Sequence, residues 1–232
     1  MKILAIDTTG KTVTAALASE DAVIGEVFIN GDQNHSITLM PMIEYLLGGA
    51  RMAVSDLTHI ACSAGPGSFT GLRIGAATAK ALAYAADIPI VAVPTLDALA
   101  YNISDAQSVI VPIMDARRRQ VYTAYYERRP ESDDLIRLSD YRAIDVADVL
   151  REVPAFAKPV IFLGDAVSVY RDVILNAHSG GKRVCAPLPS LLQRASSVAR
   201  LAVRLALEGG MTDSLDFTPF YLRQSQAERE RK

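Results

Sequence analysis

Short apolar runs alternate with polar turns along this chain, and two of the runs end at an aspartate. The run Ile3 to Ile6 is followed by Asp7, and the run Val109 to Met114 is followed by Asp115. Runs of this length that are bounded by turn residues are typical of buried β-strands. After each aspartate the chain turns into a segment of β-branched or alternating residues, which predicts a returning strand.

The same order of predicted elements occurs twice: three strands, a helix, a strand and a helix. Strands are predicted at 3–6, 12–17, 23–29, 60–64 and 88–93, and again at 109–114, 120–126, 135–138, 160–163 and 184–186. Helices are predicted at 36–47, after Thr70, and at 96–101, 146–153, 166–177 and 190–208. Such an internal duplication predicts two similar α/β lobes with mixed sheets. We expect an N-terminal lobe over 1–105 and a C-terminal lobe over 106–232.

The helix after Thr70 follows a glycine-rich loop at 64–68. Gly65 and Gly67 allow the backbone to turn sharply around Pro66, and Ser68 or Thr70 can cap the helix. Small residues then recur at every fourth position and share one helical face; they are Gly71, Gly75, Ala79 and Ala83. This face predicts a very close approach, either to the protein's own sheet or to a second protein.

The predicted helix at 36–47 has an apolar surface that is wide for a helix touching its own core on one side. Pro41 either kinks this helix or marks its first turn. We hypothesise that this helix and the helix after Thr70 together form a partner interface. The candidate interface residues are Leu39, Met42, Ile43, Leu46, Gly71, Gly75, Ala76 and Ala79.

Composition adds a few limits. The 232 residues are 50% hydrophobic with a formal net charge of −2, which is ordinary for a globular protein and does not indicate general nucleic-acid binding. Cys62 and Cys185 lie in apolar, strand-like segments, which favours free buried thiols and a reducing compartment. Asp7 comes too early for the apolar region of a signal peptide. We therefore expect a cytoplasmic protein.

Sequence signals for catalysis are weak. Gly10-Lys11-Thr12 matches the end of a phosphate-binding loop, but Ala5 stands where the first glycine is needed and a strand follows instead of a helix. Asp7 and Asp115 either hold a metal and phosphates between two lobes or simply cap the turns at the ends of their strands. His59 and His178 lack the spacing of metal ligands. We assign no catalytic, cofactor-binding or metal-binding residue.

Several segments together resemble one protein family. They are Ile3 to Thr9, His35-Ser36 with Pro41, Gly65 to Gly75, Asp115 to Arg117 with Val121-Tyr122, Gly164-Asp165, and Pro219 to Arg223. This set resembles the TsaB (YeaZ) family of bacterial tRNA threonylcarbamoyladenosine biosynthesis proteins over nearly the whole chain. The resemblance implies two duplicated RNase H-like lobes of the acetate kinase/Hsp70/actin-like (ASKHA) class.

The resemblance also implies a function. It implies a non-catalytic partner and activator of TsaD, the subunit that transfers a threonylcarbamoyl group to adenosine 37 of ANN-decoding tRNAs, with the ATPase TsaE joining them. TsaD-type subunits carry a His-x-x-x-His metal motif on the helix that starts here at His35, and the second position is Leu39. TsaD would then be the partner at the interface, and a homodimer could use the same surface when TsaD is absent.

Two alternatives stay open. The first is that the chain is an enzyme of the same fold, a small-molecule kinase or a metallopeptidase. Leu39 opposes the peptidase, and the single glycine of Thr8-Thr9-Gly10 opposes the kinase. The second concerns Arg117, Arg118 and Arg119, the one concentrated basic cluster. These arginines either contact tRNA phosphates or form a solvated turn.

Overall fold

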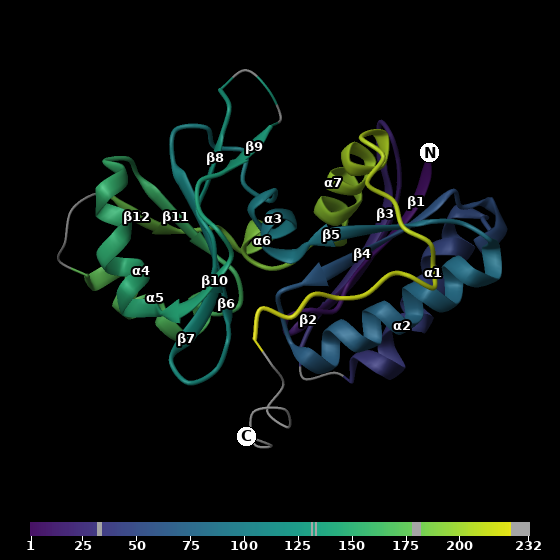
Figure 1. Ribbon diagram of the computed structural model, residues 1–232, viewed down its shortest axis with the longest axis horizontal. Coiled ribbons are helices and arrows are strands. Elements are labelled where there is room, and N and C mark those ends of the chain that lie inside the picture. The colour runs from purple at the N-terminus through teal and green to yellow at the C-terminus, as the bar shows by residue number, and fades with distance from the viewer. Residues whose placement is uncertain (32–33, 131, 133, 178–181, 224–232) are drawn as a thin grey trace. The chain divides into compact units, whose positions relative to one another are not determined.

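The computed structural model describes residues 1–31, 34–130, 132, 134–177 and 182–223. The chain forms two compact units, each with its own sheet (Figure 1). The first unit comprises Met1–Ala98 and Gln193–Tyr221, and the second comprises Leu99–Leu192 and Leu222–Lys232. In the described residues, no helix is both long enough and apolar enough to cross a membrane.

The first unit contains a five-stranded sheet in the order β3-β2-β1-β4-β5. Its strands are β1 (Lys2–Asp7), β2 (Thr12–Ser19), β3 (Val23–Asn30), β4 (His59–Gly65) and β5 (Ile90–Pro94). β1, β2 and β3 are antiparallel neighbours, whereas β1, β4 and β5 are parallel. β1 is buried on both faces because helices cover both sides of the sheet, which explains its continuous apolar run.

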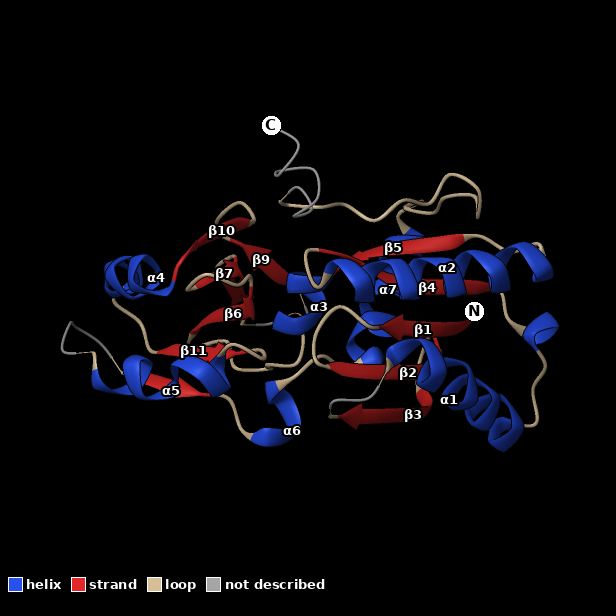
Figure 2. Cartoon of the chain, turned by 90° about the horizontal axis from the view of Figure 1, so that it is seen from below, coloured by secondary structure: helices blue, strands red, loops and turns tan. Residues whose placement is uncertain are grey.

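Helices α1 (His35–Ala50) and α2 (Phe69–Ala86) cover one face of this sheet, and α7 (Ala195–Leu207) covers the other (Figures 1 and 2). A 3₁₀ turn, η1 (Val54–Asp56), precedes β4, and the short α3 (Thr95–Ala100) follows β5. The core between the sheet and α1 and α2 includes Leu4, Ile6 and Leu17 from the strands. Each of these side chains is at most 1% exposed.

The second unit repeats this topology with the strand order β10-β7-β6-β11-β12. Its strands are β6 (Val109–Asp115), β7 (Gln120–Thr123), β10 (Arg142–Asp145), β11 (Val160–Leu163) and β12 (Arg183–Cys185). Its helices are α4 (Val146–Glu152), α5 (Val167–Asn176) and α6 (Leu188–Leu191), with a 3₁₀ turn, η2 (Val153–Phe156). The antiparallel and parallel pairings follow the same order as in the first unit. The predicted duplication and mixed α/β fold class are therefore confirmed.

Two predicted strands of the second unit differ from the prediction, one in its extent and the other in its place in the sheet. The strand predicted at 120–126 divides into β7 and β8 (Tyr126–Arg128), because the backbone N–H of Tyr125 turns away to Ser139 and β8 pairs with β6. The strand predicted at 135–138 is β9 (Leu135–Arg137), which pairs with β8. The counterpart of β3 is β10, whose half-buried residues show no alternation that the sequence could reveal.

The compact units also divide the chain differently from the predicted boundary at 105/106. The predicted helix at 190–208 is broken into α6 and α7, and α7 packs on the first unit. Glu26 of β3 holds the start of α7 by accepting hydrogen bonds from the Arg194 guanidinium, at 2.6 Å, and from the backbone N–H of Ser196, at 3.0 Å. Residues 193–221 therefore belong to the first compact unit.

Candidate functional site

The Asp7 carboxylate lies at the end of β1 and is almost completely buried. Its Oδ1 accepts hydrogen bonds from the backbone N–H and the hydroxyl of Thr9, at 2.8 and 2.7 Å, and its Oδ2 accepts one from the hydroxyl of Ser63, at 2.6 Å. Burial raises the pKa of Asp7, while the hydrogen bonds from Ser63 and Thr9 oppose that rise. Both oxygens are therefore engaged by the chain's own donors, as in a carboxylate that caps a turn.

The second strand-end aspartate, Asp115, has a similar role in the other unit. Its Oδ1 accepts a hydrogen bond from the backbone N–H of Arg117 at 2.8 Å, and its Oδ2 lies 3.4 Å from the guanidinium of the same residue. Asp165 accepts a hydrogen bond from the backbone N–H of Asp115 at 3.0 Å. Both carboxylates therefore cap the turns that follow their strands.

The glycine-rich loop packs against the turn after β1. The peptide bond between Gly65 and Pro66 is cis, and Gly65 has a left-handed φ of 123° where its Cα faces the carbonyl of Phe220. Ser68 caps α2 by accepting a hydrogen bond from the backbone N–H of Gly71 at 3.4 Å. A side chain at Gly71 would collide with the carbonyl oxygen of Thr8, whose hydroxyl donates to the Gly71 carbonyl at 2.7 Å. This loop needs glycine for a contact inside the first unit.

The small-residue face of α2 is directed at the protein's own sheet. A Cβ at Gly75 would lie 2.6 Å from the hydroxyl oxygen of Thr8 and 3.5 Å from the sulfur of Cys62. Ala79 and Ala83 are completely buried. Of the two interpretations of this face, close packing on the sheet is therefore the correct one.

All eight residues predicted for the partner interface lie in the interior of the first unit. Leu39 and Ile43 are 1% exposed, and Met42 is 4% exposed. The other five are also buried; they are Leu46, Gly71, Gly75, Ala76 and Ala79. The sequence pattern predicted that these two segments are helices, but it did not show which side of each helix faces the sheet. These buried positions are not available to a partner in the folded chain.

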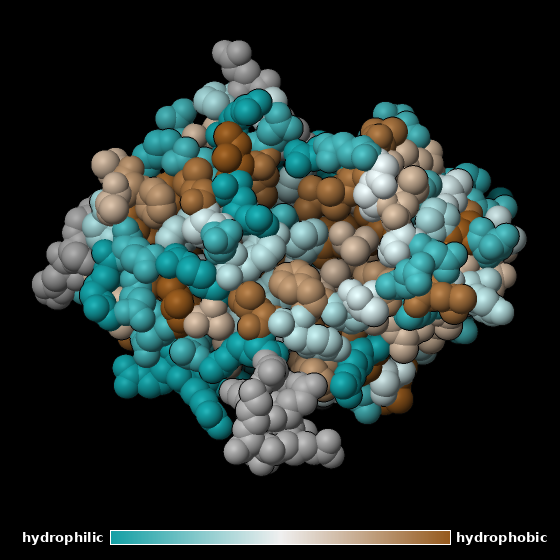
Figure 3. Space-filling model, viewed as in Figure 1, coloured by the Kyte–Doolittle hydropathy of each residue, from teal (hydrophilic) through white to brown (hydrophobic). Residues whose placement is uncertain are grey.

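A different set of residues forms the exposed side of the two helices, here called the outer face. Ile37 and Tyr45 of α1 are 69% and 74% exposed, although both are largely apolar. We assign to this face nine of the exposed residues: Ile37, Met40, Pro41, Glu44 and Tyr45 of α1 with Arg73, Ala77, Ala81 and Ala85 of α2. Figure 3 shows apolar and polar residues mixed over the surface where α2 lies. On α2, Ala77, Ala81 and Ala85 follow Arg73 at every fourth position, and this spacing in the sequence could have predicted a second small-residue stripe on the exposed side of the helix.

The histidine motif on α1 is incomplete in its structure as well as in its sequence. His35 is the first residue of the helix, and its Nε2 lies 3.1 Å from the carbonyl oxygen of Gly10. Leu39, one turn later, packs in the core with Ile6 and Leu17. Pro41 lies in the second turn of α1, so its proposed place in the first turn is wrong. Among the described residues, no three His, Cys, Asp or Glu side chains are grouped in a way that could hold a metal ion.

Of the other two histidines, the structure describes only His59. His59 contacts Thr58 through Nδ1, at 2.8 Å, and Met211 through Nε2, at 3.2 Å. Burial, with a smaller contribution from the N-terminal ammonium group, lowers the pKa of His59. His178 lies outside the described residues.

The arginine cluster forms the turn between β6 and β7. Arg117, Arg118 and Arg119 all have left-handed φ values, of 63°, 55° and 65°, and all three side chains are exposed. Three consecutive non-glycine residues in this region are unusual. The guanidinium of Arg223 donates to the carbonyl of Ala116 at 2.9 Å, which adds a fourth positive charge beside the turn. Four positive charges therefore lie at or beside this turn, together with the Asp115 carboxylate.

Comparison with known proteins places this chain among proteins of one biosynthetic process. The family model described as TsaD, tRNA N6-adenosine threonylcarbamoyltransferase, matches residues 22–230. The chain is similar to the tRNA threonylcarbamoyladenosine biosynthesis protein TsaB of Bacillus subtilis, with 38% identity over 98% of this chain and 96% of that protein.

Solved structures give the same result. YeaZ from Pseudomonas aeruginosa superposes with a TM-score of 0.81 at 26% identity, covering 95% of this chain and 99% of that one. A second crystal structure from the same organism, described as an uncharacterized protein with similarity to peptidase YEAZ, has the same TM-score and identity over 96% of this chain and 99% of that one.

Proposed function

The chain belongs to the TsaB family of tRNA threonylcarbamoyladenosine biosynthesis proteins, and from this we propose that it is the non-catalytic partner and activator of a TsaD-type subunit. That subunit would transfer the threonylcarbamoyl group to adenosine 37 of ANN-decoding tRNAs in the cytoplasm. The observation that carries the proposal is Leu39. Leu39 is buried in the core, and it occupies the position at which the metal motif of TsaD-type subunits has its second histidine.

The environment of Asp7 supports a non-catalytic role for the first unit. A general base or metal ligand needs a lone pair directed at the reacting atoms. Here both carboxylate oxygens accept short hydrogen bonds from Thr9 and Ser63. Recruiting Asp7 for catalysis would require breaking those bonds in a buried place, where an unsatisfied donor costs about 1–3 kcal/mol.

The outer face supports the partnership. Tyr45 and Ile37 give α1 exposed apolar area, and Ala77 and Ala81 allow another helix to come close to α2. This chain itself matches the TsaD family model over 22–230, so a TsaD-type subunit would offer two equivalent helices. A pairing of like surfaces about a pseudo-two-fold axis would give a four-helix contact. A homodimer could form through the same outer face when the TsaD-type subunit is absent, and a TsaE-type ATPase would join the heterodimer.

The arginine turn provides the proposed contact to tRNA within this assembly. Arg118 and Arg119 have no ion pair with a carboxylate among the described residues. Arg117 forms an ion pair with the Asp115 carboxylate. Exposed guanidinium groups on a short turn bind phosphates through charge and release counterions when they do so. Through this turn the proposed complex would hold tRNA.

A reconstitution experiment tests the proposed function. We expect threonylcarbamoylated tRNA only when this chain is combined with a TsaD-type subunit, a TsaE-type ATPase, threonylcarbamoyl donor and ANN-decoding tRNA. The isolated chain should neither hydrolyse ATP at a useful rate nor carry a stoichiometric metal by elemental analysis. One tightly held iron or zinc per chain, coupled to hydrolytic activity, would instead favour the enzyme that the peptidase description of a similar structure suggests.

A further inference from the structure

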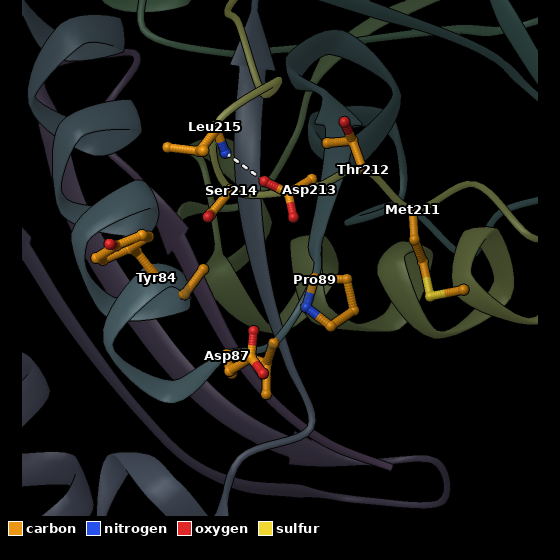
Figure 4. A pocket seen from close by; sticks show the side chains of 10 residues that line it. Tyr84, Asp87, Pro89, Met211, Thr212, Asp213, Ser214 and Leu215 are labelled. Atoms are coloured by element: carbon orange, nitrogen blue, oxygen red, sulfur yellow. Dashed lines mark hydrogen bonds between the residues drawn. The ribbon is translucent and has the colours of Figure 1, made fainter.

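A solvent-accessible hollow of about 440 Å³ lies in the first unit beside the C-terminal end of α2. It is formed by the last turn of α2, the residues leading into β5, and the segment 211–215, which follows α7 (Figure 4). The segment is fixed there by a backbone pairing between Thr212 and Ile90. The lining residues are Ala83, Tyr84, Asp87, Ile88, Pro89, Met211, Thr212, Asp213, Ser214 and Leu215.

The polar groups of the hollow are incompletely used by the protein itself. Ser214 is only 6% exposed, yet its hydroxyl has no hydrogen-bond partner within the described residues, and Figure 4 shows it directed into the hollow. One oxygen of Asp213 accepts a hydrogen bond from the backbone N–H of Leu215 at 2.8 Å, which leaves the other oxygen for a ligand. Because this hydroxyl opens onto the solvent-accessible hollow, it is free to bond to water or to a ligand there.

The charge of the hollow is negative. Asp87 and Asp213 contribute carboxylates, and no lysine, arginine or histidine is among the lining residues. The hollow also adjoins the C-terminus of α2, where the helix dipole is negative. The nearby Lys80, whose ammonium group donates to the carbonyls of Leu215 and Phe217 at 2.9 and 3.1 Å, offsets one of these two negative charges and leaves the hollow with a net negative charge. A cationic ligand fits this environment, whereas an anion does not.

The apolar walls favour an organic cation over a metal ion. The ring of Tyr84 stands on one side, and Ile88, Pro89 and Met211 provide further apolar surface. A hard metal ion needs about six oxygen ligands, and the hollow offers two carboxylates. An aromatic face beside carboxylates suits an ammonium or guanidinium group attached to a hydrocarbon stem.

We infer that this hollow binds an ammonium or guanidinium group carried on a short alkyl chain. Asp87 and Asp213 would pair with the charge, the hydroxyl of Ser214 would be available to an N–H group, and Tyr84 would cover the stem. The same chemistry has two sources: a free alkylamine, or an arginine or lysine side chain of another protein. The inference does not depend on the proposed role in tRNA modification.

Calorimetric titration of the full chain tests the inference with two probes. Agmatine represents the free cation, and N-acetyl-arginine N-methylamide represents an arginine side chain within a polypeptide. We expect saturable 1:1 binding of at least one probe, and none of the neutral analogue N-acetyl-citrulline N-methylamide. Binding of agmatine alone would identify a small molecule as the source, and binding of the arginine amide would identify a side chain.

Variants locate the binding in the hollow. The double variant Asp87→Asn/Asp213→Asn should lower the affinity for the probe by about tenfold or more, because hydrogen bonds to charged groups are lost. Asparagine at 213 keeps the oxygen that caps Leu215, and Ser214→Ala provides an independent second test. The control Asp216→Asn removes an exposed charge of the same segment that does not line the hollow. Absence of saturable binding, or equal losses in Asp216→Asn, would overturn the inference.

Discussion

The Asp7 carboxylate shows how a single buried group links a strand, a turn and a helix-bearing loop. Its hydrogen bonds join the end of β1 to Thr9 of the following turn and to Ser63 of β4. In the same turn, the carbonyl oxygen of Thr9 accepts a hydrogen bond from the backbone N–H of Ser68, the N-cap of α2, at 2.7 Å. The position of α2 therefore depends on how well this buried charge is satisfied.

Ser63→Ala tests that dependence. Loss of one hydrogen bond to a carboxylate should lower the free energy of unfolding by about 1.5–3 kcal/mol at neutral pH. Burial already raises the pKa of Asp7 above its ordinary value of 3.8, and the loss of the Ser63 donor raises it further. Denaturant melts of both proteins over a range of pH would measure the difference.

The sign of the pH dependence follows from proton binding. Between the unfolded and the folded pKa of Asp7, the folded state binds more protons, so stability falls as the pH rises above 3.8. In Ser63→Ala the fall continues to a higher pH. The difference in stability between variant and parent should therefore be smallest at acidic pH, where Asp7 is protonated in both proteins, and should grow as the pH increases. A difference in stability that is constant with pH would show that Asp7 is not the group affected.

At the scale of the element, α1 has two apolar sides with different roles. Met42 is 4% exposed in the core, whereas Tyr45, one turn along, is 74% exposed. A glutamate at Met42 would bury a charge and remove packing, which should cost about 3–5 kcal/mol. A glutamate at Tyr45 should change the free energy of unfolding by less than about 0.5 kcal/mol.

The same pair tests the outer face. Tyr45→Glu should remain folded and lose at least about tenfold in affinity for the TsaD-type subunit, because aromatic residues dominate desolvated interfaces. Val169→Glu, at a residue of α5 that is 58% exposed, serves as the control for adding charge to an exposed apolar position. If Tyr45→Glu binds the subunit normally, the partner docks elsewhere. Thermal melts and binding titrations of all three variants give the comparison.

The pattern of apolar residues predicted elements better than it predicted faces. Asp7 and Asp115 marked the ends of the two leading strands correctly, because buried parallel strands are continuous apolar runs. Leu39 and Met42 were assigned to a partner although they face the sheet. On a helix that is apolar on both sides, composition cannot tell which side is inside. The short β10 was missed for a related reason, since its four residues are all half-buried and have no period.

At the scale of the whole molecule, the duplicated topology leaves equivalent positions with different chemistry. The turn after β1 contains threonines and a glycine and is closed by hydrogen bonds to Asp7. The corresponding turn after β6 contains Arg117, Arg118 and Arg119 and is exposed. In the first turn Thr8 and Thr9 are buried and only Lys11 exposes a positive charge, while the second turn exposes three arginines. This asymmetry was visible in the sequence, but the exposure of the arginines was not.

The arginine turn supplies the last prediction. Replacing Arg117, Arg118 and Arg119 by asparagine removes three positive charges, and asparagine tolerates the left-handed backbone of this turn better than most residues. In the assembled complex, tRNA binding should weaken, and the plot of log affinity against log salt should become shallower by about two, because fewer counterions are released. Arg117 contributes less than its neighbours because Asp115 already shares its charge.

Arg129→Ala/Arg151→Ala is the matched control. Both arginines are exposed in the same unit, and each is paired with a carboxylate, that of Asp134 or Asp148. Removing them takes away two positive charges, against three in the asparagine variant, without altering the turn, so the salt dependence of tRNA binding should stay close to that of the parent. An unchanged slope in the asparagine variant would return the turn to the status of a solvated surface feature. A shallower slope in that variant alone would place tRNA phosphates at the β6–β7 turn.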